Sequence, residues 1–215
     1  MKTILCFGDS NTFGTNPAGG RHPRHVRWTG RLQKLLGEDY YVIEEGMGGR
    51  TTVWDDPLEP NRNGLRFLPV ALQSHQPLDM VILSLGTNDC KTIFQAEPRV
   101  IAAGIGALCD EVLHFPYREG YPIPKILIVS PIHIGDAVKD SIYITFDRSS
   151  AVKSHELSSH VEKVAGQRNC LFVDASQVAV PGQQDQLHMD EESHRALAEK
   201  LYEVIQEYFK SHANV

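Results

Sequence analysis

Two short motifs near opposite ends of the chain carry residue types that suit nucleophilic chemistry. Ser10 closes a Gly-Asp-Ser motif directly after the apolar run 4–7. Asp185 and His188 stand three residues apart in an Asp-Gln-Leu-His motif. A serine nucleophile needs a base to take its proton and a carboxylate to orient that base. We therefore predict that Ser10 is a nucleophile, with His188 as its base and Asp185 as the orienting carboxylate.

Each motif also has a simpler interpretation. A serine after Gly-Asp is common in turns and at the start of a helix. Asp185 and Asp190 could merely start a turn and cap the last helix, and His188 is one of ten histidines. The catalytic interpretation is favoured because Ser10 follows a predicted strand, where a nucleophile is held rigidly yet stays exposed.

Two further motifs follow predicted strands. A Gly-Thr-Asn-Asp motif contains Asn88, whose side-chain amide can donate a hydrogen bond to an oxyanion. The glycine-rich segment 46–49 contains Gly48, whose unshielded backbone N–H can approach a ligand closely. Each motif alone is also a common turn former. Four such motifs after the first, second, third and fifth predicted strands form a joint signal for acyl transfer.

Short apolar runs alternate with amphipathic helical segments, which is the pattern of βαβ units around a parallel sheet. The predicted strands are 4–7, 41–44, 80–85, 126–129 and 171–173. Helical periodicity predicts helices over 28–36, 63–74, 98–112, 149–165 and 191–208. The loops after the strands meet at one edge of such a sheet, where ligands bind.

These elements predict an α/β fold: a three-layer α/β/α sandwich with a flavodoxin-like, five-stranded parallel sheet. A chain of 215 residues without a linker, a repeat or a low-complexity segment suits one catalytic domain over 1–215. The expected substrate pocket lies at the loop edge, and core packing is an equal alternative for its apolar members. The pocket residues are Asn11, Trp54, Phe94, Ile132 and Ile134.

Composition narrows the function classes. The net charge of −6, without a basic stripe, argues against a nucleic-acid partner. No stretch is long enough to span a membrane, and the N-terminus runs straight into a predicted strand, so we expect a cytoplasmic protein without a membrane partner. The four cysteines have no metal-type spacing and are expected to be reduced thiols. We expect neither a metal nor a cofactor.

Three residues near the motifs have open roles. Cys90 follows the Gly-Thr-Asn-Asp motif, but a nucleophilic role would require a base of its own, so a packed or pocket-lining thiol is expected. His22 and His25 lie in a basic loop. They could bind a metal or an anionic substrate, although a solvated loop is the preferred interpretation.

The chain resembles the SGNH hydrolase superfamily, also called GDSL esterases and lipases. The four motifs match that family in order over nearly the whole chain. The resemblance implies Ser10 as nucleophile, His188 as base and Asp185 as its orienting group. It also implies an oxyanion hole made of the backbone N–H groups of Ser10 and Gly48 and the side chain of Asn88.

The segments 28–30, 42–46 and 50–52 resemble the arylesterase and acyltransferase branch in particular. Members of that branch are often oligomeric, so a homo-oligomer is expected, and apolar loop residues such as Trp54 and Phe67 hint at an interface. Some members transfer acyl groups to alcohols even in water.

The expected function is therefore that of a serine esterase that hydrolyses short-chain acyl or aryl esters through an acyl-enzyme. The expected substrate is a small molecule, and acyltransferase activity is a candidate additional activity. One alternative is a carbohydrate O-acetylesterase with the same three catalytic residues. An alternative from another class is a flavodoxin-like, non-catalytic module that binds a small ligand. Such a module would have no use for Asp185 and His188.

Overall fold

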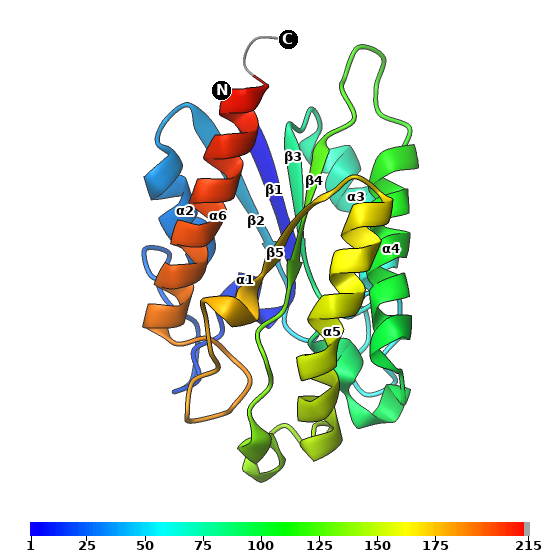
Figure 1. The fold of residues 1–215 in the computed structure, drawn as a ribbon, viewed down its shortest axis with the longest axis vertical. Coiled ribbons are helices and arrows are strands. Elements are labelled where there is room, and N and C mark those ends of the chain that lie inside the picture. Colours follow the sequence, from blue (N-terminus) through cyan, green and yellow to red (C-terminus); the bar gives the residue numbers. More distant parts are fainter. Residues whose placement is uncertain (213–215) are drawn as a thin grey trace.

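The computed structural model describes residues 1–212 and contains a five-stranded parallel sheet between two layers of helices (Figure 1). The strand order is β2-β1-β3-β4-β5, and every neighbouring pair is parallel. The strands are β1 (Lys2–Gly8), β2 (Tyr40–Gly46), β3 (Met80–Ser84), β4 (Lys125–Ser130) and β5 (Leu171–Asp174). The predicted α/β sandwich with a flavodoxin-like sheet is confirmed.

Two helices cover one face of the sheet and three cover the other, as Figure 1 shows at its left and right sides. The first pair is α2 (Trp28–Leu36) and α6 (Glu191–Ser211). The second layer consists of α3 (Gly64–His75), α4 (Pro98–His114) and α5 (Arg148–Gln167). These five helices lie where the apolar periodicity predicts them, with ends that differ by a few residues.

The strands are apolar on both faces because both faces are covered. Along β1, Ile4 and Cys6 join the core under α2 and α6, whereas Leu5 and Phe7 join the core under the other three helices. This alternation follows from the period of two in a strand. It makes β1 a rigid central support that ends at the candidate nucleophile.

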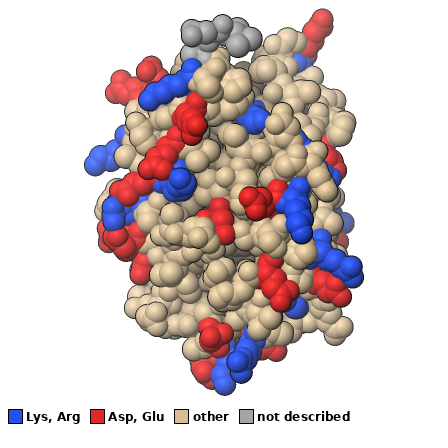
Figure 2. All heavy atoms as spheres, in the orientation of Figure 1, with Lys and Arg blue, Asp and Glu red and all other residues tan. Residues whose placement is uncertain are grey.

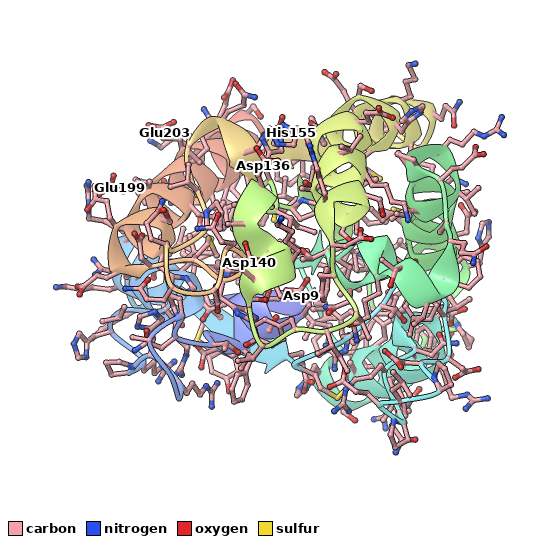
Figure 3. All side chains as sticks on the ribbon, turned by 90° about the horizontal axis from the view of Figure 1, so that it is seen from below. Asp9, Asp136, Asp140, His155, Glu199 and Glu203 are labelled. Atoms are coloured by element: carbon pink, nitrogen blue, oxygen red, sulfur yellow. The ribbon has the colours of Figure 1, made fainter. Side chains whose placement is uncertain are left out.

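The carboxyl ends of β1 and β3 lie side by side at the centre of the sheet. After β1 the chain forms β2 on one side of β1, and it then returns to form β3 on the other side. In open parallel sheets, such a reversal of strand order opens a crevice for ligands. Figure 3 looks onto this edge and places Asp9 near its middle, between α6 on one side and α4 and α5 on the other. The segments after β1, β2 and β3 therefore meet there.

The main departure from the sequence expectation is α1 (Ser10–Phe13), a single helical turn in a segment without a periodic pattern. Asp9 caps it by accepting a hydrogen bond from the backbone N–H of Asn11. Gly14 ends it in the left-handed conformation, at φ 86°. Ser10 is thus the first residue of a capped turn that leads directly out of β1.

Charged side chains are scattered over the surface. On the face drawn in Figure 2, acidic and basic side chains are interspersed, and uncharged residues cover most of the middle. Across residues 1–212, every helix is too short or too polar to pass through a lipid bilayer.

Candidate active site

Three side chains from opposite ends of the chain form one hydrogen-bonded row at the carboxyl edge of the sheet. The hydroxyl of Ser10 lies 2.8 Å from Nε2 of His188, and Nδ1 of His188 lies 2.7 Å from Oδ2 of Asp185. The other oxygen of Asp185 accepts the backbone N–H groups of Leu187 and His188, each at 2.9 Å. The carboxylate therefore fixes both the imidazole ring and the turn that carries it.

Hydrogen bonds keep the Asp185 carboxylate charged. Burial alone would raise the pKa of Asp185, but the hydrogen bond with the His188 side chain and those from the two backbone N–H groups outweigh it and lower the pKa. An ionised carboxylate accepts the proton on Nδ1 of His188, which leaves Nε2 free to accept the proton of Ser10.

Two glycines allow the backbone to come together around Ser10. A Cβ atom on Gly8 would lie 2.0 Å from the hydroxyl of Thr12 and 2.8 Å from the carbonyl oxygen of Ser84 on β3. A Cβ atom on Gly46, at the end of β2, would lie 2.1 Å from the backbone nitrogen of Phe13. Side chains at these positions would push α1 away from the sheet.

Asn11 clamps the turn that carries the histidine. Its side-chain Nδ2 donates to the carbonyl oxygen of Leu187 at 3.4 Å, and its Oδ1 accepts the N–H of Met189 at 2.9 Å. These backbone groups flank His188 on both sides. The residue after the nucleophile therefore holds the candidate base in place across 176 and 178 positions of sequence, a role that no local pattern reveals.

The candidate oxyanion donors face the same cavity as Ser10. Gly48 and Asn88 both line it, and a Cβ atom on Gly48 would have nothing within 4 Å, so the space beside its Cα is empty. Nδ2 of Asn88 donates to the carbonyl oxygen of Arg50 at 3.1 Å. An amide nitrogen carries two protons, so one remains for an oxyanion.

A buried carboxylate joins the loops that carry these donors. Asp89 accepts the backbone N–H of Thr52 at 3.0 Å and also the Thr52 hydroxyl. Burial raises the pKa of Asp89 to about 6, although the Thr52 hydrogen bonds act in the opposite direction. Burial likewise raises the pKa of Asp9 to about 6. Both carboxyls stabilise the backbone around the site.

The cavity beside Ser10 has a volume of about 550 Å³, in the range of small-molecule sites. One wall is apolar and comes largely from the segment before α5. It includes Ile142, Tyr143, Ile144 and Phe146, together with Phe13, Leu58 and Leu187. The other wall is charged. It contains Asp56, Glu59, Arg62 and Lys91. The cavity therefore offers two chemically different surfaces to a substrate.

The charged wall is built around a buried lysine that the sequence does not reveal. Nζ of Lys91 donates to Asp56 at 2.7 Å and to Glu59 at 2.6 Å, and the Lys91 and Asp56 side chains are almost fully buried. The partners lie 35 and 32 residues away in sequence, so no spacing pattern marks them. The ring of Tyr143, in the apolar part of the lining, meets the His188 ring edge-on at a centroid distance of 5.3 Å.

The five residues predicted as pocket residues do not line this cavity. Asn11 forms the clamp described above. Trp54 and Phe94 stack on each other at a centroid distance of 5.8 Å and pack against the larger core. Ile132 and Ile134 are buried, each in a different one of the two cores. The pocket prediction is therefore wrong for the four apolar residues, which pack in or against the hydrophobic cores instead.

The structure also locates the residues whose roles were open. Cys90 is fully buried, and burial raises the pKa of its thiol to about 12, so it is uncharged at neutral pH. His22, expected in a solvated loop, is instead buried: its ring meets His194 edge-on, and its Nε2 lies 3.3 Å from the carbonyl oxygen of Met189. His25 is exposed. In the described part of the chain, no three His, Cys, Asp or Glu residues gather as metal ligands would.

An α/β sandwich whose loops bring a serine, a histidine and an aspartate into one hydrogen-bonded row has the architecture of the SGNH hydrolases. A family model described as the GDSL-like lipase/acylhydrolase family matches residues 6–196, and the chain belongs to this family. The match includes all four motifs, from the Gly-Asp-Ser turn to the Asp-Gln-Leu-His turn.

Two similar solved structures are esterases. The native M. smegmatis aryl esterase is 38% identical, with 96% of this chain and 99% of that chain covered, at a TM-score of 0.90. Est24, a carbohydrate acetylesterase from Sinorhizobium meliloti, is 36% identical, with 97% and 100% covered, at a TM-score of 0.91. Family and structural similarity together support an ester hydrolase.

A third relative is similar over a shorter region. The uncharacterized lipoprotein YqeF of Bacillus subtilis (strain 168) is 30% identical over 99 residues, which are 46% of this chain. The matched region spans only 37% of that lipoprotein.

Proposed function

We propose that this protein is a serine esterase that hydrolyses short-chain acyl or aryl esters through an acyl-enzyme on Ser10. One observation carries the proposal: Ser10, His188 and Asp185 form a hydrogen-bonded row, with distances of 2.8 and 2.7 Å, at the wall of a cavity. This is the arrangement that activates a serine hydroxyl in unrelated hydrolases.

The mechanism follows from the positions of the donors and acceptors. Oγ of Ser10 attacks the ester carbonyl carbon while Nε2 of His188 accepts the hydroxyl proton. The carbonyl oxygen gains negative charge and accepts hydrogen bonds from the backbone N–H groups of Ser10 and Gly48 and from the Asn88 side chain. The C–O bond to the alcohol breaks as His188 protonates the leaving oxygen, and the acyl group stays on Ser10.

Deacylation repeats these steps with a second nucleophile. His188 takes a proton from water, and the hydroxide equivalent attacks the acyl-enzyme, which releases the carboxylic acid and restores Ser10. An alcohol in place of water would give a new ester, so acyltransferase activity needs no further residue. The partition of product between acid and ester in the presence of an added alcohol measures this activity.

The first test compares p-nitrophenyl acetate hydrolysis by the wild type and by Ser10→Ala. The exposed Ser159 on α5 offers a matched control, Ser159→Ala. We expect hydrolysis by the wild type and the control, and none above background by Ser10→Ala, since the nucleophile is gone. Equal rates in all three proteins would contradict the proposal and favour a non-catalytic, ligand-binding module.

A second candidate, carbohydrate O-acetylesterase activity with the same three residues, is favoured by the charged wall. The polar groups of Glu59 and Arg62 suit an alcohol that carries several hydroxyl groups, whereas the apolar wall suits an acyl or aryl group. A higher kcat/KM for acetylated sugars than for phenyl acetate would support this candidate. The reverse order would support an arylesterase.

A further inference from the structure

A second cavity lies next to the catalytic edge, and no step of the proposed mechanism uses it. It has a volume of about 410 Å³ and lies between the ends of β1 and β2 and the helix α3. Its wall includes Glu45, Arg50, Phe67, Val70, Ser74 and His75. Met47 is the one residue it shares with the active-site cavity among the residues that the structure describes.

Arg50 is the unusual group in this wall. The residue is 5% exposed, and its guanidinium stacks over the Phe7 ring at 4.0 Å. Its Nη1 donates to two backbone carbonyl groups, those of Gly8 and Glu45, while its buried Nε has no hydrogen-bond partner. Within residues 1–212, no carboxylate oxygen lies within 4.0 Å of the guanidinium nitrogens. A cation buried in this way lacks the paired anion that normally offsets its loss of water.

The charges around Arg50 leave room for an anion. The Glu45 carboxylate is paired with His75 at 3.0 Å instead of with Arg50. Glu45 and Asp9 attract Arg50 only through space, Glu45 the more strongly, and Arg62 adds a second positive charge nearby. A singly charged anion would supply the direct ion pair that Arg50 lacks, whereas repulsion from the Glu45 carboxylate in the same wall disfavours a doubly charged one.

We propose that this cavity binds a small monocarboxylate with an apolar body, with the carboxylate on the Arg50 guanidinium and the body against Phe67 and Val70. Nη1 already donates to two carbonyl groups and Nε is buried, so the donors left for a carboxylate are those of Nη2, which can form charge-assisted hydrogen bonds. Phe67 and Val70 provide the apolar surface that a free inorganic anion would not use.

Arg50 also connects this cavity to the candidate oxyanion hole. Its side chain holds the carbonyl of Gly8, two residues before Ser10, and its own carbonyl accepts the Asn88 side chain. A carboxylate bound to Arg50 would therefore affect the position of both Ser10 and Asn88. Carboxylates are also what ester hydrolysis releases, so the bound product would regulate turnover. This regulatory consequence rests on the proposed function, whereas the binding itself does not.

The test measures binding of benzoate without reference to activity. Val70→Trp fills the cavity from its exposed side, and Val152→Trp on α5 is a control of similar exposure. At about ten times its Kd, benzoate should raise the Tm of the wild type and of the control by about 3–6 °C. We expect no rise for Val70→Trp, and Ser74→Trp is a second filling variant should Val70→Trp fail to fold.

A crystal structure with benzoate locates the ligand. Density for its carboxylate on the Arg50 guanidinium supports the proposal. No rise in the wild-type Tm, an equal rise in the filled variants, or density only beside Ser10 would overturn it. These readouts stay valid if the protein proves not to be an esterase, so the two proposals fail separately.

Discussion

The imidazole of His188 is held from several sides by single contacts. Asp185 fixes Nδ1, Ser10 meets Nε2, and the Tyr143 ring limits rotation by its edge-on contact. Each contact is within the range of a direct interaction, so the ring is oriented before any substrate arrives. Such preorganisation is what lets a hydrogen-bonded row act in catalysis, because misplacement by 1 Å can cost about 10² in rate.

Replacing Asn88 by Ala tests the oxyanion hole at the level of one side chain. The variant loses a donor that acts on charge developing in the transition state, so kcat should fall by about 10²–10³ while KM changes little. Steady-state kinetics with p-nitrophenyl acetate measure both constants, and a thermal melt checks that the variant is folded. Unchanged kcat in a folded Asn88→Ala protein would remove this residue from the mechanism.

The side chain of Asn11 links the helical turn α1 to the turn 185–189. In Asn11→Ala, the carbonyl of Leu187 and the N–H of Met189 lose their partners. We expect the free energy of unfolding to fall by about 1–3 kcal/mol for the unpaired buried groups. We also expect kcat/KM to fall, since the turn that carries His188 is released. Urea denaturation and ester hydrolysis measure the two effects.

A control separates positioning from mere stability. Oδ1 of Asn16 accepts a local hydrogen bond from the N–H of Ala18, so Asn16→Ala should affect neither quantity much. If Asn11→Ala lowers stability but leaves kcat/KM and its pH profile unchanged, Asn11 has a structural role only.

The elements differ in how far the sequence predicts them. The strands are evident because each is a short apolar run between helical segments, and burial on both faces removes any polar alternation. The turn α1 is not predictable by periodicity, since four residues contain little more than one helical repeat.

Local motifs predict which side chains meet at the sheet edge, but not their distant partners. Ser10, Gly48, Asn88 and His188 all face one cavity, as expected from their places after parallel strands. The cavity walls could not be predicted in the same way. Hydropathy marks residues such as Trp54 as apolar, but the direction of a loop side chain depends on contacts far away in sequence.

The pH dependence of stability concerns the whole molecule. Burial raises the pKa of Asp89 from 3.8 to about 6, so the folded state holds this proton more tightly than the unfolded chain. The resulting stabilisation is complete below pH 3.8 and is lost as the pH rises through about 6. Between about pH 4 and 7, the wild type should lose on the order of 3 kcal/mol relative to Asp89→Asn.

Comparison with this variant isolates one group. Asp9 titrates in the same direction, whereas the lowered pKa values of Asp56 and Asp185 act in the opposite direction. Urea denaturation over this pH range measures the difference, with the exposed Asp136→Asn as control (Figure 3). Parallel curves for the wild type and Asp89→Asn would contradict the assignment.

The predicted homo-oligomer stays a prediction, which analytical ultracentrifugation tests.

The row of Ser10 and His188 joins residues that are 178 positions apart. During synthesis at about 5–20 residues per second, the ribosome makes the serine roughly 9–36 seconds before the histidine. Throughout that interval, the nascent chain carries a serine hydroxyl without its base and without the clamp between Asn11 and the histidine turn. On the proposed mechanism, catalytic competence therefore appears only after the whole sheet, which ends at Asp174, has been translated.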